Sequence, residues 1–161
     1  MYVELEEAVR LREKGMHRQA NELLMKLAEI HKKDGETHYH CAWSFDVLGK
    51  EKEAVPYYEK AIHLGLKPAD LKGAYVGLGS TYRTLGRYKK AIETFEKGLC
   101  SFPDDPALNV FYSLALYNTG RHQESMYILL QQIIALSNHD EIKRYERAIN
   151  LYSSQLDRIW Q

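Results

Sequence analysis

The sequence is poor in cysteine and proline and has no long apolar run. Its two cysteines, Cys41 and Cys100, are too few and too far apart for a disulfide framework, so we expect reduced thiols and a cytoplasmic protein. No apolar stretch approaches the roughly 20 residues that span a bilayer, and the acidic start lacks the basic and apolar regions of a signal peptide. We therefore expect no membrane partner.

Charge of one sign is not in excess either. The chain has 22 basic and 22 acidic residues, and the signs alternate within every segment. A nucleic-acid-binding protein normally has a basic surplus on at least one element, so we predict no nucleic-acid partner.

Motifs for catalysis and cofactor binding are absent as well. The sequence has no glycine-rich phosphate loop, paired CxxC, HExxH motif or nucleophile elbow, which argues against an enzyme and predicts no cofactor. His38, His40 and Cys41, with His31 and His63, invite a metal hypothesis. However, residues two apart on a helix do not share a face, and a site needs three or four converging ligands, so we predict no metal.

What the sequence does have is a recurring glycine. Gly15, Gly49, Gly86 and Gly120 each follow an apolar helical stretch, at intervals of 34, 37 and 34 residues. A fixed period in this range predicts a solenoid of helix pairs. Glycine suits the end of a helix because it adopts the left-handed backbone without a Cβ penalty.

Aligned on these glycines, the copies share a pattern. The third copy reads Tyr75-x2-Leu78-Gly79-x2-Tyr82, then Ala91-x3-Phe95, then a proline at 103. It closely resembles the tetratricopeptide repeat pattern W-x2-L-G-x2-Y…A-x3-F…P. The other copies match less completely, and the resemblance covers about residues 1 to 136. Supporting residues in the first, second and fourth copies are Ala8, Leu11, Ala20 and Leu24; Ala42, Phe45, Ala54, Tyr58 and Ala61; and Leu116 and Leu129.

The resemblance implies an all-α fold, a right-handed α-solenoid of four helix-turn-helix pairs with a C-terminal capping helix. We expect one domain over residues 1–161, with repeats at about 1–34, 35–71, 72–105 and 106–138 and the capping helix at about 140–160. One pair cannot bury its own apolar stripe, so the copies must stack. Small residues such as Gly79 and Ala91 would let paired helices approach, while large residues such as Phe95 fill the space between pairs.

The last predicted helix has an apolar stripe of its own. Its members recur at intervals of three and four: Ile142, Tyr145, Ile149, Tyr152, Leu156 and Ile159. This spacing suits a helix that caps repeat four, and it also suits a coiled-coil seam for self-association. We expect capping, with Trp160 left at the edge.

The resemblance also predicts a binding surface, because the first helix of each pair lines the concave face in this family. The groove would be apolar and aromatic with few charges, and Trp43 would be its anchor. An alternative is that the last helix fills the groove. The predicted partner-binding residues are Tyr2, Leu5, Val9, Arg12, Tyr39, Trp43, Asp46, Val76, Ser80, Arg83, Val110, Leu114 and Tyr117.

The favoured function is a protein–protein interaction scaffold that binds a peptide or helix in this groove. Two alternatives stay open, a homodimerising structural or assembly protein and a small tetratricopeptide-type secretion chaperone. A clamp for the acidic C-termini of heat-shock chaperones is disfavoured, because its positions lack the required lysine, arginine and asparagine. They carry Leu5, Val9, His40, Gly73 and Gly77.

Overall fold

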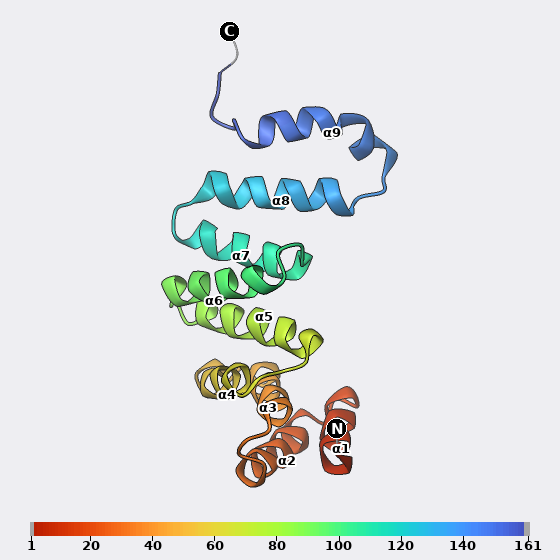
Figure 1. The fold of residues 1–161 in the computed structure, drawn as a ribbon, viewed down its shortest axis with the longest axis vertical. Helices are drawn as coiled ribbons and strands as arrows, with labels where there is room; N and C mark the ends of the chain where they lie inside the picture. The colour runs from red at the N-terminus through yellow and green to blue at the C-terminus, as the bar shows by residue number, and fades with distance from the viewer. Residues whose placement is uncertain (1, 160–161) are drawn as a thin grey trace.

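The computed structural model describes residues 2–159, and within them it contains nine α-helices and no strand (Figure 1). We call the first helix of each pair helix A and the second helix B. The helices are α1 (Val3–Glu13), α2 (His17–Ile30), α3 (Gly35–Val47), α4 (Glu51–Leu64), α5 (Pro68–Thr84), α6 (Tyr88–Ser101), α7 (Pro106–Asn118), α8 (His122–Leu136) and α9 (Asp140–Ser153).

The turns inside the pairs fall at the predicted glycines. Gly15, Gly49, Gly86 and Gly120 have φ angles of 76°, 67°, 71° and 79°, the left-handed region in which a side chain is strained. Each turn satisfies helix-end carbonyls; for example, the backbone N–H of Lys50 donates to the carbonyl of Phe45 at 3.0 Å. The glycine period therefore marks the helix pairs correctly.

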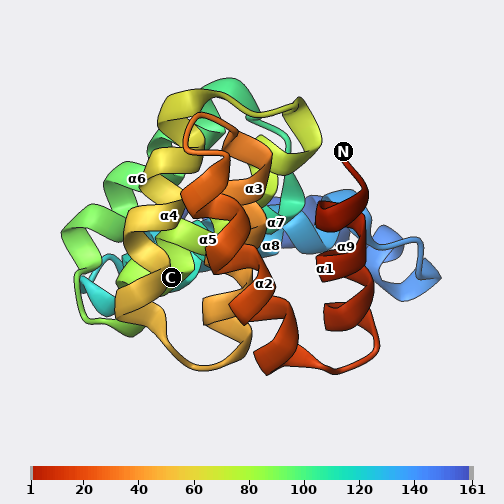
Figure 2. The ribbon, with the colours of Figure 1, turned by 90° about the horizontal axis from the view of Figure 1, so that it is seen from below.

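The pairs stack into an elongated solenoid. Each helix contacts the next along the chain, and the A helices also contact one another, α1 with α3, α3 with α5 and α5 with α7. Figure 2, seen from the N-terminal end, shows that successive helices are rotated relative to one another. This arrangement confirms the predicted α-solenoid.

Small and large residues alternate in the core as predicted. Ala42, Ala54 and Ala91 are fully buried, and so is Phe95. A Cβ added at Gly79 would lie only 2.5 Å from the Phe95 ring, so the ring rests directly on the backbone of α5. The close approach of α5 and α6 therefore depends on glycine at this position.

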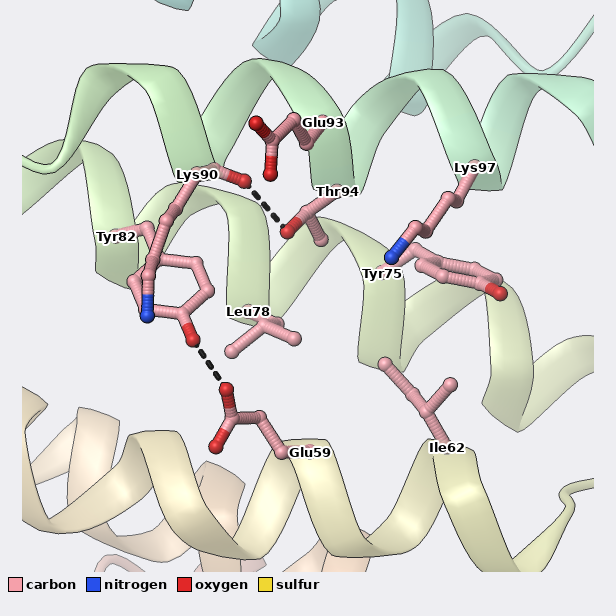
Figure 3. Close-up of a pocket in the computed structure, with 9 residues that line it drawn as sticks. All are labelled: Glu59, Ile62, Tyr75, Leu78, Tyr82, Lys90, Glu93, Thr94 and Lys97. Carbon is pink, nitrogen blue, oxygen red and sulfur yellow. Dashed lines mark hydrogen bonds between the residues drawn. The ribbon is translucent and has the colours of Figure 1, made fainter.

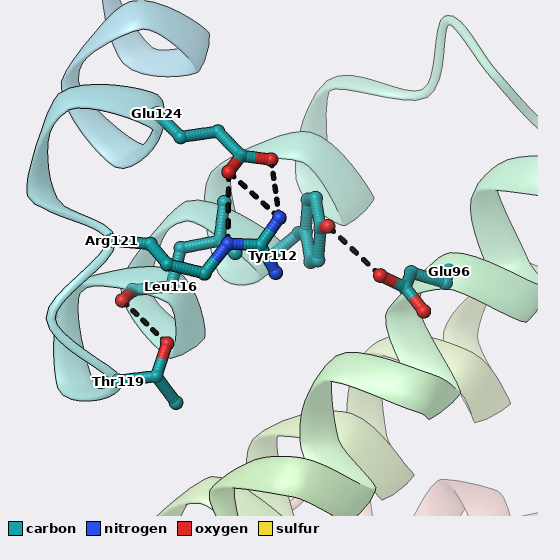
Figure 4. A network of polar contacts seen from close by, with 6 residues as sticks. All are labelled: Glu96, Tyr112, Leu116, Thr119, Arg121 and Glu124. Carbon is teal, nitrogen blue, oxygen red and sulfur yellow. Dashed lines mark hydrogen bonds and ion pairs between the residues drawn. The ribbon is translucent and has the colours of Figure 1, made fainter.

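The third and fourth pairs are joined by polar contacts (Figure 4). The Tyr112 hydroxyl of α7 donates to the Glu96 carboxylate of α6 at 3.1 Å. Nearby, Arg121 and Glu124 form a two-pronged ion pair at the start of α8. Asp105 caps α7 by accepting from the backbone N–H of Leu108 at 3.0 Å.

The C-terminal helix caps α8 but is shorter than expected. Helix α9 ends at Ser153, so the predicted helix of about 140–160 is wrong for residues 154–159, and residue 160 lies outside the described residues. Of the described helices, α9 contacts only α8, through Ser153 and through a hydrogen bond from Gln131 to Asn150 at 3.0 Å. It therefore does not fill the surface formed by the A helices.

The apolar stripe of α9 is only half covered. Ile142 and Ile149 are half-buried, whereas the two tyrosines of the stripe are about half exposed. Positions 142, 146, 149 and 153 are among the covered positions of α9, whereas the two tyrosines lie outside this face and remain exposed. Leu156 and Ile159 lie past the end of the helix and are exposed. Trp160 lies outside the described residues.

Candidate functional site

A cavity of about 550 Å³ opens between three A helices, α3, α5 and α7. We call it the A-helix cavity. It includes part of the surface that the sequence predicts for partner binding, because five of the thirteen predicted residues line it. The lining residues are Tyr39, Trp43, Asp46, Val47, Tyr58, Lys72, Gly73, Val76, Gly77, Ser80, Asp105, Ala107 and Phe111.

Two glycines of α5 create the floor of this cavity. A Cβ at Gly77 would lie 2.4 Å from the Tyr58 hydroxyl oxygen, and one at Gly73 would lie 2.2 Å from that of Tyr39. Without side chains at these positions, both tyrosine rings pack against the backbone of α5. The two glycines therefore lower the helix propensity of α5 but allow the tyrosine rings to pack against its backbone.

Asp46 links the helices that form the cavity wall. Its carboxylate accepts hydrogen bonds from the Tyr58 hydroxyl at 2.7 Å and from the Thr81 hydroxyl at 3.0 Å, which ties together α3, α4 and α5. Burial raises the pKa of Asp46, and the two donated hydrogen bonds oppose that rise. The sequence predicts Asp46 as a partner-binding charge, but the structure shows both of its oxygens already engaged.

Trp43 occupies the position predicted for an anchor. It lines the A-helix cavity with 41% of its surface exposed. The Tyr39 and His40 rings lie 6.1 and 6.4 Å from its ring, and the His40 ring is nearly parallel to it. Trp43 is therefore held in a fixed orientation while much of its surface remains open to a partner.

Arg12 covers the Trp43 ring, with its guanidinium carbon 3.7 Å from the ring centroid. Arg12 is only 9% exposed, and its Nη1 donates to Nδ1 of His40 at 3.3 Å. Because an arginine can only donate, Nδ1 of His40 is the acceptor and its ring is neutral. Burial, together with the Arg12 charge, lowers the pKa of His40 to about 4.

Several predicted binding residues lie elsewhere. Leu5 is fully buried in the hydrophobic core, so it offers no surface to a partner and its predicted role is corrected. Tyr39 is nearly buried and contributes mainly to the cavity floor. Tyr2 is half-buried and shares a hydrogen bond with Thr37 at 2.7 Å. Val9 is half-buried outside the cavity lining.

The predicted residues of α7 also lie outside the cavity lining. Val110 and Leu114 are half-buried, and Tyr117 is exposed with its ring 4.7 Å from that of His122. Arg83 of α5 donates from Nε to the Asn118 side-chain oxygen at 2.8 Å. Val76 and Ser80 do line the cavity. All five predicted residues that line the cavity therefore belong to α3 and α5.

Phe111 and Val47 line the cavity but were not predicted. Phe111 follows Val110, the residue that the repeat pattern selects, and Val47 follows Asp46 in the same way. These two residues could have been found from the sequence because each is apolar and directly follows a residue that was predicted to face the groove. The other unpredicted members are Tyr58, Lys72, Gly73, Gly77, Asp105 and Ala107.

A second pocket of about 350 Å³ lies between α4, α5 and α6 (Figure 3). The Tyr82 hydroxyl donates to the Glu59 carboxylate, and the Lys90 ammonium lies 5.3 Å from the centroid of the Tyr82 ring. Thr94 donates to the backbone carbonyl of Lys90 at 2.7 Å. These contacts engage Glu59, Tyr82 and Thr94, and the charged residues Glu93 and Lys97 also line the pocket (Figure 3).

Metal-ligating residues do not gather in residues 2–159, where no group of three or more could hold an ion. The Nε2 of His38 donates a hydrogen bond to the backbone carbonyl of Lys32 at 3.1 Å, and the Nδ1 of His40 accepts one from Arg12. Likewise, no helix in this part of the chain is both long and apolar enough to cross a membrane.

Solved structures of similar fold were found at low sequence identity. A MamA fragment from Desulfovibrio magneticus RS-1 is 18% identical, covering 96% of this chain and 92% of that one, with a TM-score of 0.72. A Podosopora anserina protein with nearly identical TPR-like repeats is 20% identical over 93% of this chain and 80% of that one, with a TM-score of 0.69. YrrB, described as a TPR protein with an unusual peptide-binding site, is 17% identical over 96% and 86%, with a TM-score of 0.65.

Comparison with curated proteins finds no match. The family model of the tetratrico peptide repeat matches residues 35–156, which is most of the chain and includes α3 to α9. A solenoid of such repeats is a scaffold for protein–protein interaction. The glycine turns, the stacked pairs and this match agree, and the chain belongs to the tetratricopeptide repeat family.

Proposed function

We propose that this protein is a cytoplasmic interaction scaffold, and not an enzyme, that binds a peptide or helix of a partner protein in the A-helix cavity. The observation that carries the proposal is Trp43, a large aromatic residue held rigidly yet 41% exposed in an open cavity. Tryptophans in such settings dominate the energy of many interfaces. Val47, Val76 and Phe111 extend the apolar surface around it.

Helix α9 leaves this surface free, because it contacts only α8 among the described helices. The similar solved structure of YrrB carries a peptide-binding site according to its description, which is consistent with a peptide ligand here.

The test is affinity capture from a cell lysate with three proteins, wild type, Trp43→Ala and Tyr117→Ala. Tyr117 is the matched control, an exposed aromatic residue of an A helix that does not line the cavity. We expect partners to co-purify with wild type and Tyr117→Ala but to be lost with Trp43→Ala, while all three melt within a few degrees of one another. Unchanged capture by a folded Trp43→Ala protein contradicts the proposal.

Homodimerisation is a second candidate, supported by the C-terminal end of the solenoid. Helices α8 and α9 leave large apolar side chains exposed, and such patches often mark association surfaces. Size-exclusion chromatography with light scattering at micromolar concentration tests it, since a monomer rules it out. The exposed residues are Met126, Tyr127, Ile133, Leu136, Tyr145, Leu151 and Tyr152.

A further inference from the structure

We infer that the partner segment carries a carboxylate, from an aspartate or glutamate side chain, that pairs with Arg12 while a neighbouring apolar side chain occupies the A-helix cavity. The inference rests on the proposed function and specifies the chemistry of its ligand. It starts from an unusual feature of Arg12, a residue that is only 9% exposed and forms no ion pair with an acid among residues 2–159.

Arg12 has few of its hydrogen bonds made within the chain. A guanidinium has five N–H donors, and only the one to His40 is used among residues 2–159. No carboxylate in that range forms an ion pair with it, and Glu13, on the same helix, acts on its charge only from a distance. Buried charges in proteins are normally paired, so this one lacks its usual complement.

Asp46, an acid that lines the A-helix cavity, is already occupied. Asp46 holds the position in the second repeat that Arg12 holds in the first, three residues before the turn glycine. Its two oxygens accept from Tyr58 and Thr81 instead, so it does not neutralise Arg12. Lys72 is a cation that lines the A-helix cavity, and it is paired with Asp105 at 3.3 Å. Arg12 is therefore the charge beside the cavity that is left for a ligand.

The geometry places this charge next to the apolar anchor. The Arg12 guanidinium lies 3.7 Å from the centroid of the Trp43 ring, and the same ring lines the cavity. An extended peptide advances about 3.3 Å per residue. A carboxylate two or three residues from an apolar side chain would therefore reach Arg12 while that side chain sits beside Trp43, Val76 and Phe111. Arginine favours such an acceptor because its planar fork can bond both carboxylate oxygens.

The experiment selects ligands from a displayed library of random dodecapeptides with the full chain immobilised. We expect enrichment of peptides with an aspartate or glutamate two or three residues from a large apolar residue. The best peptide is then synthesised in two forms, with the acid and with the matching amide. Binding is followed by the fluorescence of Trp43 in a Trp160→Phe background, which removes the other tryptophan.

The acid form is expected to bind wild type at least about tenfold more tightly than the amide form, the usual advantage of a charge-assisted hydrogen bond in a desolvated site. Arg12→Gln should bind both forms equally. Arg83→Gln is the matched control, because Arg83 occupies the same repeat position in the third pair but bonds to Asn118. It should keep the preference for the acid.

Four results overturn the inference. Equal binding of the acid and amide forms by wild type shows that the cation–π contact with Trp43 is the whole role of Arg12, and this comparison needs no variant to fold. A folded Arg12→Gln protein that still prefers the acid shows that another group reads it. A library that yields no ligand contradicts the proposed peptide-binding function itself, whereas apolar ligands without acid preference overturn this inference alone.

Discussion

Substitution of Gly79 tests the packing on which the repeat stack depends. The residue sits in the middle of α5, and an added Cβ would lie 2.5 Å from two carbon atoms of the Phe95 ring. Phe95 is fully buried in the core, so its ring cannot swing into solvent to relieve the contact. Any side chain at position 79 must push α5 and α6 apart or distort the ring.

Two effects oppose each other in Gly79→Ala. Alanine improves helix propensity by about 1 kcal/mol, whereas overpacking a core typically costs about 1–3 kcal/mol. We expect the clash to prevail and the protein to lose about 1 kcal/mol. Gly79→Leu adds three more carbon atoms to the same space, and we expect a loss of about 3 kcal/mol or more. For a chain of this size, that loss lowers Tm by roughly 6–12 °C.

The assay is chemical denaturation followed by circular dichroism, with Ser80→Leu as the matched control. Ser80 is the next residue on α5 but faces the A-helix cavity, so a leucine there should leave the fold nearly as stable as wild type. Removing the ring in Gly79→Leu/Phe95→Ala should cost less than the sum of the single changes. A Gly79→Leu protein that melts with wild type would refute the repeat alignment.

Three further outcomes are expected. Ala91→Leu, at the fully buried small position facing Gly79 in the repeat pattern, should destabilise the fold by about 1–3 kcal/mol in the same denaturation assay, and an unchanged midpoint contradicts this. The pKa of His40 is lowered to about 4, so the unfolded chain takes up a proton before the folded chain as the pH falls below the ordinary value of 6.5. Relative to His40→Gln, wild type should therefore lose about 3 kcal/mol of stability between pH 7 and 4. Parallel pH profiles of the two proteins would contradict this expectation. Deletion of residues 140–161 uncovers α8 and should make the protein insoluble or remove its cooperative melting, whereas a soluble product that only changes from dimer to monomer identifies α9 as an association element.

The fold follows from the sequence because its strongest signal has a local physical cause. A glycine with positive φ is needed at each turn inside a pair, and the spacing of Gly15, Gly49, Gly86 and Gly120 therefore reveals the repeats directly. The buried small and large positions follow once this register is known. The surface location of Trp43 likewise follows from the repeat register, and the residue is 41% exposed.

The parts that the sequence did not reveal depend on side-chain choices between nearby partners. Asp46 looks like a free surface charge until Tyr58 and Thr81 are seen to reach it from other helices. Leu5 and Tyr39 occupy the same repeat position, and both are buried in the core where neighbouring helices pack against them. Where α9 stops, and which of its faces meets α8, also follows from tertiary contacts and not from its apolar spacing.

The contact pattern of α9 has a consequence for local opening of the solenoid. Helices α3 and α5 are held on both sides, by neighbouring A helices and by their own B helices, whereas α9 contacts α8 alone. In a linear array the free energy of opening depends on the number of nearest-neighbour interfaces lost. Amide hydrogens of α9 should therefore exchange with solvent first, and those of α3 and α5 last. The helices that shape the A-helix cavity would then stay protected while the C-terminal end unravels and re-forms.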